Sequence, residues 1–412
     1  MDGPQDASLA FVPTPTPAEM QTLALKHDAV LVQGFALRAY PSLKGMGLPV
    51  IVDLYDPFTL SLLEQDAHLG ASERAARSQR VQEILDEQLA SGDFFICASE
   101  RQRDLWIGAL TAIGRVNPQT WSLDNSLRAL IDVVPFGLPE SPPEPLAGRP
   151  AAFPKDVSDR DLVLLWGGGI YNWFDPLSLI QAIARVVPFE PRIKLVFMST
   201  THPNPGIPPR MWMPQRARDL ASALDLQGHV FFNDDWIPYA HRGGWLLSAD
   251  CGVSTHFNNA ETRYSFRTRI LDYLWASLPI ITTEGDVLAD LVQREGLGWT
   301  VPPKDIDALV DAILAMASNA SQRRAMRKRI ESVAVGMTWA HAAVPLVQFC
   351  NHLRKAPDSA AGVWRMAPST RTGGRPYRLW QLVVLGLSSL RDRGVRATLR
   401  EARVWWRRRR LL

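Results

Sequence analysis

The sequence predicts an α/β protein built from two doubly wound parallel sheets that face each other across a cleft. Three observations support this prediction. Apolar runs of strand length alternate with helical stretches, and each run is continuously apolar, as expected for parallel strands buried on both faces. The length of 412 residues suits two domains better than one. A segment with six prolines, Pro139–Pro154, separates the two series of runs.

The first series of runs defines a domain over residues 1–138. One helix is predicted near Ala18–Lys26. The runs predicted as strands are Leu9–Val12, Ala29–Val32, Val50–Leu54, Phe94–Ala98 and Ile131–Gly137.

The second series defines a domain over residues 150–335, again with strands and helices in alternation. The predicted strands are Leu162–Trp166, Ile193–Met198, His229–Phe232, Cys251–Ser254, Pro279–Thr282 and Gly298–Val301. The predicted helices are Leu177–Val187, Gln215–Leu224, Arg267–Ala276, Ile306–Ser318 and Gln322–Val333. This order is typical of a Rossmann-like domain.

The C-terminal part has a different organisation. A crossing helix is predicted over residues 338–355, a Pro/Gly/Ser-rich linker over 356–376, and a basic amphipathic helix over 377–412. From Arg365 onward there are thirteen arginines and only two acidic residues, although the net charge of the whole chain is +3. Such a helix is expected to bind an anionic membrane surface, and the alternative is that its leucine stripe docks on the first domain.

Composition excludes several classes of protein. The acidic N-terminus and the short aliphatic run Leu382–Leu387 indicate neither secretion nor membrane spanning. Three distant cysteines without zinc spacing favour a reducing cytoplasm. The histidines His202, His241 and His256 have no metal-ligand spacing, so we expect no metal and no other cofactor. Nothing in the body matches a nucleic-acid-binding motif, so no nucleic acid partner is expected.

A glycine triplet marks the first candidate ligand site. Gly167, Gly168 and Gly169 follow a predicted strand and precede a helix that opens at Asp175-Pro176. Ligands of doubly wound sheets bind at the carboxyl ends of strands, and glycines let a ligand approach the backbone. The triplet lacks the spacing of a dinucleotide-binding loop. A tight turn without a ligand is the alternative.

A cluster of arginines marks the second candidate site. Arg263, Arg267 and Arg269 surround a helix that is predicted to begin near Ser265. Arginines at a helix N-terminus are suited to a diphosphate, and Asp272 could accept hydrogen bonds from sugar or ribose hydroxyls. The alternative is a solvated, charged helix face.

The run from Ser265 to Ile281 resembles the donor-site signature of retaining GT-B glycosyltransferases of family 4, also called glycosyl transferases group 1. That family has Glu-x₇-Glu with Ser-Phe-Gly after the first Glu, then a helix that ends in Gly-x-Pro and a strand. Here Ser265 and Phe266 match, Asp272 replaces the second Glu, and Pro279 matches the helix end. The resemblance extends over ~130–355.

The resemblance implies a GT-B fold and a donor site formed by Ser265, Phe266, Asp272 and the glycine triplet. Tyr264 stands in place of the family's first Glu, and Glu261 is expected to act catalytically in its stead. Gly169 and Phe174 stand in place of the Arg and Lys that grip the diphosphate. Arg267, with Arg263 or Arg269, is expected to supply the missing charge.

The first domain resembles the family's acceptor-side domain with one or two βα units missing at its start. Asp56 follows a predicted strand at the place where the family often has a His-Asp pair, which makes it the second catalytic candidate. The alternative is that Asp56 caps the helix that follows Pro57.

The function implied by this resemblance is transfer of a hexose, with retention, from a nucleotide diphosphate sugar to a hydroxyl of a cell-surface glycan or lipid-linked acceptor. The expected location is the cytoplasm, on the inner face of the membrane. A non-catalytic GT-B relative that binds a sugar nucleotide or a partner at the membrane surface is the competing hypothesis.

Overall fold

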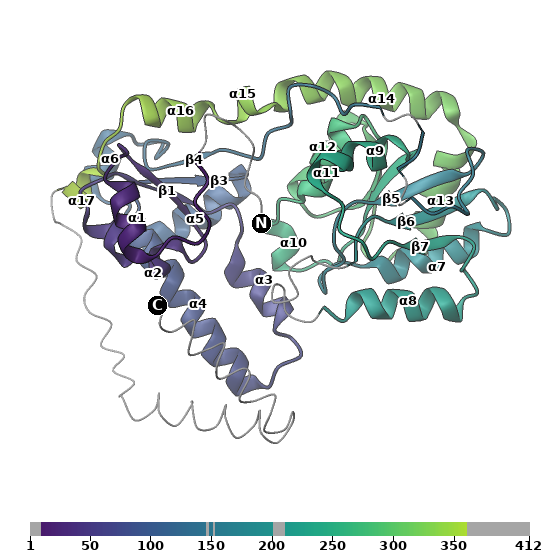
Figure 1. The fold of residues 1–412 in the computed structure, drawn as a ribbon, viewed down its shortest axis with the longest axis horizontal. Helices are drawn as coiled ribbons and strands as arrows, with labels where there is room; N and C mark the ends of the chain where they lie inside the picture. Colours follow the sequence, from purple (N-terminus) through teal and green to yellow (C-terminus); the bar gives the residue numbers. More distant parts are fainter. Residues whose placement is uncertain (1–9, 146–147, 151–152, 201–210, 361–412) are drawn as a thin grey trace.

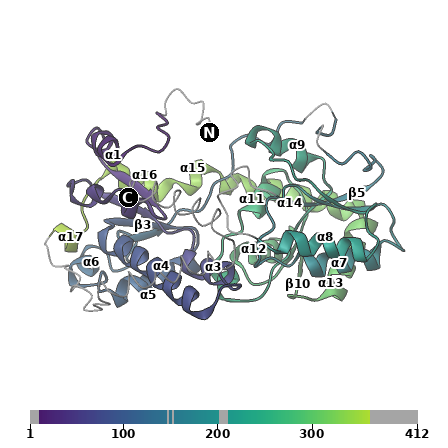
Figure 2. The ribbon, with the colours of Figure 1, turned by 60° about the horizontal axis from the view of Figure 1, so that its bottom comes forward.

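The computed structural model describes residues 10–145, 148–150, 153–200 and 211–360. Two α/β lobes lie side by side and are joined along one edge by a helical arm (Figure 1). A view turned by 60° shows the same arrangement (Figure 2). The predicted helix over residues 377–412 and most of the linker before it lie outside the described residues.

Every strand pair in both lobes is parallel. The first sheet has the order β1-β2-β3-β4, with β1 Val30–Gln33, β2 Val50–Asp53, β3 Phe94–Cys97 and β4 Ile131–Val133. The second sheet has the order β10-β9-β8-β5-β6-β7, with β5 Leu162–Trp166, β6 Ile193–Phe197, β7 Val230–Phe232, β8 Cys251–Ser254, β9 Ile280–Thr283 and β10 Gly298–Val301. The predicted α/β class with two parallel sheets is confirmed.

Helices cover both sheets. In the first lobe they are α1 Pro17–Ala24, α2 Ala36–Ala39, α3 Phe58–Gln65, α4 Ala71–Ser91, α5 Glu100–Ala112 and α6 Pro118–Leu123. In the second lobe they are α7 Pro176–Val186, α8 Met213–Ala223, α9 Arg242–Leu247, α10 Ala260–Tyr264, α11 Thr268–Trp275, α12 Val287–Glu295, α13 Ile306–Ser318 and α14 Ala320–Ala334. The chain then continues through α15 Trp339–Ala342, α16 Val344–Asn351 and α17 Pro357–Ala360.

Strand order in the second sheet locates its ligand-binding end. The chain runs outward from β5 to β7 on one side, and then from β8 to β10 on the other. The winding direction therefore reverses between β5 and β8. In doubly wound sheets a crevice opens at the carboxyl ends of the strands at this point.

The predicted strand at Leu9–Val12 is wrong for the described residues 10–12, which form no strand. Phe11 and Val12 are exposed, and two prolines, Pro13 and Pro15, follow directly. Proline lacks the backbone N–H that a sheet ladder needs, so the apolar run does not extend the sheet.

The predicted crossing helix over residues 338–355 is interrupted. It consists of α15 and α16, because Pro345 has no N–H to continue the hydrogen-bonding of the preceding turn. The arm returns to the first lobe, where Phe349 packs on Phe94 with ring centroids 4.4 Å apart.

The beginning of the predicted linker is an ordered part of the first lobe. Asp358 in α17 is fully buried and accepts hydrogen bonds from Arg115 at 2.7 and 3.2 Å. Lys355 pairs with buried Asp93 at 3.1 Å. The described chain therefore ends against the first lobe.

Two consecutive residues of α5 fasten the lobes together. The Gln102 side-chain amide donates to the carbonyls of Tyr55 at 2.6 Å and Tyr264 at 2.8 Å. Arg101 donates to the Gly285 carbonyl at 3.0 Å and pairs with Asp290. The relative position of the lobes thus rests on specific contacts beside the cleft.

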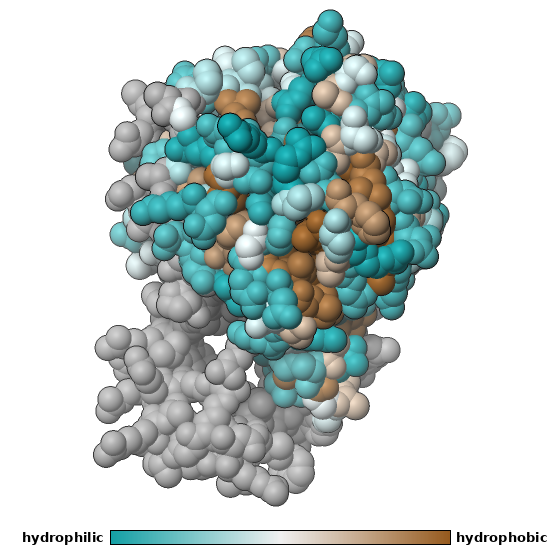
Figure 3. All heavy atoms as spheres, turned by 90° about the vertical axis from the view of Figure 1, so that its right-hand side faces the viewer, coloured by the Kyte–Doolittle hydropathy of each residue, from teal (hydrophilic) through white to brown (hydrophobic). Residues whose placement is uncertain are grey.

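Apolar residues of the second lobe are mainly internal. Two clusters cover the two faces of its sheet. Its outer end is largely hydrophilic, with a limited band of apolar residues (Figure 3). Among the described residues, no helix has the length and apolar character needed to cross a bilayer.

Candidate functional site

A cleft with a volume of about 540 Å³ lies between the lobes, at the carboxyl end of β5. Its second-lobe wall comprises Gly167, Gly168, Gly169, Tyr171, Trp173, Phe174, Glu261, Ser265, Phe266, Arg267, Thr268, Arg269 and Asp272. Its first-lobe wall comprises Phe35, Tyr55, Asp56, Pro57, Phe58, Ser61, Leu62 and Gln65. All site residues predicted from the sequence meet here except Arg263, which is exposed on α10 and does not line the cleft.

The glycine triplet forms the turn that follows β5. Gly168 has a φ of +82°, a conformation that favours glycine. The Gly167 amide donates to the Tyr273 hydroxyl at 2.8 Å, whereas within the described residues the amides of Gly168 and Gly169 have no hydrogen-bond partner. A tight turn without a ligand accounts for the positive φ of Gly168, but it does not account for the unpaired amides. Two unpaired amides beside a cleft also suit an anionic ligand.

Tyr273 fixes this turn from behind. Its ring packs over Gly252 of β8, where an added Cβ would lie 2.3 Å from the ring. Its hydroxyl lies 3.0 Å from the Leu165 carbonyl and 2.8 Å from the Val253 carbonyl, and it accepts the Gly167 amide proton. The glycine in β8 therefore makes room for the side chain that orients the ligand-facing turn.

Arg269 is a buried cation in the cleft wall. Its guanidinium lies 4.0 Å from the Phe174 ring centroid and 4.6 Å from that of Trp166, and it donates to the Gly169 carbonyl at 2.8 Å. The second terminal nitrogen, Nη1, has no partner among the described residues. Burial lowers the pKa of Arg269 to about 10, so it remains charged at neutral pH.

Arg269 and Arg267 both lie over the ring of Phe174. The Arg267 guanidinium is 4.9 Å from the same ring centroid. Both positive charges therefore lie at the same aromatic ring of the cleft wall.

The charge of Arg267 is already compensated. Its two terminal nitrogens donate to the Glu261 carboxylate at 3.0 and 2.7 Å, and the Ser265 hydroxyl donates to the same carboxylate at 2.5 Å. Glu261 and Arg267 are only 5% and 6% exposed. Glu261 thus reaches the cleft as predicted, but as a partner of Arg267.

The helix predicted over Arg267–Ala276 is α11, and its first residue, Thr268, lies three residues after the start expected near Ser265. α10 ends at Tyr264 and α11 begins at Thr268, so residues 265–267 form a short non-helical bend between the two helices. Opposite charges six residues apart do not face each other on one continuous helix, and this bend brings Glu261 and Arg267 together.

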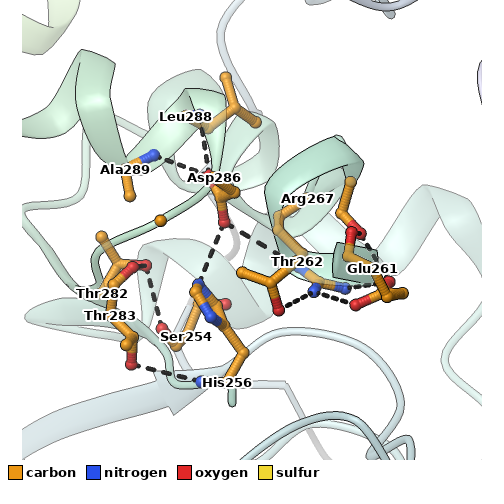
Figure 4. Close-up of polar contacts among 12 residues, drawn as sticks. Ser254, His256, Glu261, Thr262, Arg267, Thr282, Thr283, Asp286, Leu288 and Ala289 are labelled. Carbon is orange, nitrogen blue, oxygen red and sulfur yellow. Dashed lines mark hydrogen bonds and ion pairs between the residues drawn. The ribbon is translucent and has the colours of Figure 1, made fainter. Parts of the chain in front are cut away.

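A second buried layer lies behind Arg267. Asp286 accepts hydrogen bonds from the amides of Leu288 and Ala289, both at 2.8 Å. Its other carboxylate oxygen lies 3.2 Å from His256 Nε2 and 3.9 Å from Arg267 Nε (Figure 4). Desolvation opposes ionisation of Asp286, but His256, Arg267 and the amides lower its pKa below the usual value. This ionised carboxylate helps to orient Arg267.

Asp272 of α11 lies farther along the same wall, 3.1 Å from Arg242 of α9. Burial raises the pKa of Asp272 to about 6, while Arg242 and Arg269 oppose the rise. Asp272 is therefore mostly ionised at neutral pH. An ionised carboxylate accepts hydrogen bonds from hydroxyl groups.

Asp56 lines the opposite wall after β2. The alternative of a helix cap is wrong, because Pro57 precedes α3 as its N-cap residue without a side-chain cap. The carboxylate instead accepts a hydrogen bond from the Ser61 hydroxyl at 3.3 Å. Desolvation between the cleft walls raises the pKa of Asp56, and the charge of Glu261 adds to this. Asp56 is thus placed to contact a ligand from the first lobe.

Several lining residues were not predicted. Tyr171 and Trp173 stack with ring centroids 5.0 Å apart, and Phe35 and Phe58 lie 6.0 Å apart on the facing wall. Aromatic residues occur throughout cores, so spacing alone gives no signal for them. In the described part of the chain, no group of three or more His, Cys, Asp or Glu side chains is arranged to hold a metal ion.

Comparisons with known proteins give one family match and several similar folds. Residues 161–319 match the family described as glycosyl transferases group 1. No curated protein sequence gives a significant match. The structure resembles sucrose-phosphate synthase from Thermosynechococcus elongatus, with a TM-score of 0.58 and 16% identity over 82% of this chain and 77% of that one.

Two further solved structures are similar over comparable lengths. Anabaena HepE in complex with UDP gives a TM-score of 0.55 and 14% identity over 82% of each chain. WaaG, a glycosyltransferase involved in lipopolysaccharide biosynthesis, gives 0.55 and 14% over 83% of this chain and 88% of that one. Family match and fold together define the class: the chain is a glycosyltransferase of the GT-B type.

Proposed function

We propose that this chain transfers a hexose from a nucleotide diphosphate sugar to a hydroxyl of a cell-surface glycan or lipid-linked acceptor, with retention and without a metal. The observation that carries the proposal is the position of Arg269 beside the unpaired amides of Gly168 and Gly169, at the reversal point of the sheet. A departing diphosphate needs such fixed positive charge and N–H donors.

The other residues have defined roles in this proposal. Asp272 would accept hydrogen bonds from nucleotide or sugar hydroxyls, and Asp56 on the facing wall would contact the reacting sugar or the acceptor hydroxyl. The ion pair of Glu261 and Arg267 would line the cleft between Asp272 and Asp56. Retention is an inference from the family resemblance. Closure of the lobes around the donor would exclude water from the reacting groups, which would strengthen each of these electrostatic contacts.

The first test is calorimetric titration of the full-length chain with UDP-, GDP- and dTDP-sugars. We expect one nucleotide class to bind, and the free nucleoside diphosphate to compete with it. Absence of binding by every donor would refute the proposal.

A non-catalytic sugar-nucleotide-binding protein remains a second candidate, because Glu261 compensates Arg267 and leaves Arg269 as the uncompensated arginine of the described cleft wall. One cation stabilises a leaving diphosphate less than two. Release of nucleoside diphosphate from the donor that binds, measured with a panel of glycan acceptors, separates the two candidates. Binding without release favours the second.

We propose further that the basic tail attaches the enzyme to an anionic membrane on the cytoplasmic side. Its support is the arginine-rich sequence from Arg365 onward, and the last described helix before it, α17, is buried against the first lobe through Asp358. Deletion of residues 377–412 should release the protein from anionic liposomes in a flotation assay. Equal partitioning of both forms would contradict the assignment.

A further inference from the structure

Among the residues that the structure describes, Arg242 is the charged partner of Asp272 that comes from another helix. Arg242 Nη1 lies 3.1 Å from Asp272 Oδ1, and the two side chains are 23% and 24% exposed. Asp272 lines the cleft, whereas Arg242 does not. The carboxylate therefore has the cleft on one side and a guanidinium on another.

The Arg242 guanidinium is held in place by aromatic rings. It lies 4.3 Å from the Tyr239 ring centroid and 5.4 Å from that of Trp275. Trp275 is itself fixed, because its indole N–H donates to the Ser141 carbonyl at 2.7 Å. Gly243, the next residue, packs against Pro143 and the Trp275 ring. A guanidinium fixed in this way loses little conformational entropy when it pairs with a carboxylate.

We propose that Arg242 is a positioning residue that keeps the Asp272 carboxyl ionised and oriented towards the cleft, so that Asp272 can accept hydrogen bonds from donor hydroxyls at neutral pH. This inference rests on the proposed role of Asp272 in donor binding. It adds that Arg242, a residue outside the cleft wall, controls the ionisation and the orientation of the Asp272 carboxylate.

The charges around Asp272 support this role. In the described part of the chain two cations act on it, Arg242 from α9 and Arg269 from its own helix, and the neighbouring Tyr273 is neutral because burial raises its pKa. Burial drives the pKa of Asp272 upward to about 6, and Arg242 is the larger of the two opposing influences. Without Arg242 the carboxyl would become protonated closer to neutral pH. A protonated carboxyl keeps only part of its capacity to accept hydrogen bonds.

The test compares Arg242→Gln with Arg242→Lys. In the parent, donor affinity measured by calorimetry should be constant above pH 7 and fall below about pH 6, since protonation removes the acceptor. In Arg242→Gln the fall should move upward by about one to two pH units, which makes binding at pH 7 roughly two- to tenfold weaker and restores it near pH 9. Arg242→Lys keeps a positive charge and should stay close to the parent profile.

A second readout does not depend on the donor. In the full chain labelled with ¹³C-carboxyl aspartate, the resonance that disappears in Asp272→Asn reports the titration of Asp272. We expect this titration to move to higher pH in Arg242→Gln. An unchanged titration, or an equal loss of affinity at every pH, would overturn the inference, and tighter donor binding would identify Arg242 as a competitor of the donor.

The two proposals can fail separately. If Asp272→Asn binds the donor as tightly as the parent does, the proposed donor role of Asp272 is wrong, but the carbon titration still tests the effect of Arg242. If no donor binds at all, the carbon titration still shows whether Arg242 controls the protonation of Asp272.

Discussion

Replacement of Arg269 by Met is expected to weaken binding of a nucleoside diphosphate by about 10- to 100-fold, the scale of a lost hydrogen bond to a charged group. Arg269 is buried against Phe174 and Trp166, and its Nη1 has no partner within the described residues. Met fills a similar volume between the rings, so the fold should be retained. Calorimetry with the nucleoside diphosphate measures the loss.

The matched control for this variant is Arg263→Met. Arg263 belongs to the same predicted arginine cluster, but it is exposed and does not line the cleft. Its replacement should leave affinity unchanged. Binding of the nucleoside without phosphates should be equal in all three proteins, because Arg269 acts on the phosphates. If Arg269→Met bound the nucleoside diphosphate as tightly as the parent does, the proposed diphosphate site at this wall would be wrong.

The second large effect concerns stability. Glu261→Gln should lower the free energy of unfolding by about 3–5 kcal/mol, because it removes the hydrogen-bonded counter-charge of the buried Arg267 and leaves only the more distant Asp286. The double replacement Glu261→Gln with Arg267→Met removes both charges and should be much less destabilised than the sum of the single variants. Urea denaturation followed by tryptophan fluorescence gives the free energies of unfolding of Glu261→Gln, Arg267→Met and the double variant.

The activity of the double variant then distinguishes a structural role of Glu261 from a catalytic one. If Glu261 acts only as a counter-ion, the double variant regains folding and keeps donor turnover. If Glu261 acts on the reacting sugar, the double variant folds but remains inactive. Additive destabilisation of the two single variants would show that the pair is not coupled.

The course of the strands could be predicted because buried parallel strands are continuously apolar. The run Leu162–Trp166, for example, is fully buried β5. The run at residues 10–12 had the same apolar character, but prolines follow it and no strand forms. The placement of the glycine triplet at the ligand end followed from the doubly wound order.

Pairing between charged side chains could not be predicted from spacing. The arginine cluster was interpreted as one helix N-terminus, yet the bend at Ser265–Arg267 turns Arg267 to Glu261 and leaves Arg263 exposed. Arg242 lies 30 residues before Asp272 and meets it only because α9 and α11 pack on the same face of the sheet. Such long-range contacts depend on packing, which has no local sequence signal.

A crystal structure of the full chain with the nucleotide sugar that binds best tests the central claim most directly. We predict that the diphosphate lies at the turn after β5, within hydrogen-bonding distance of the Gly168 or Gly169 amide and of Arg269, with a donor hydroxyl at Asp272. A nucleotide bound outside the cleft, or a diphosphate that contacts neither the glycine turn nor Arg269, would contradict this account.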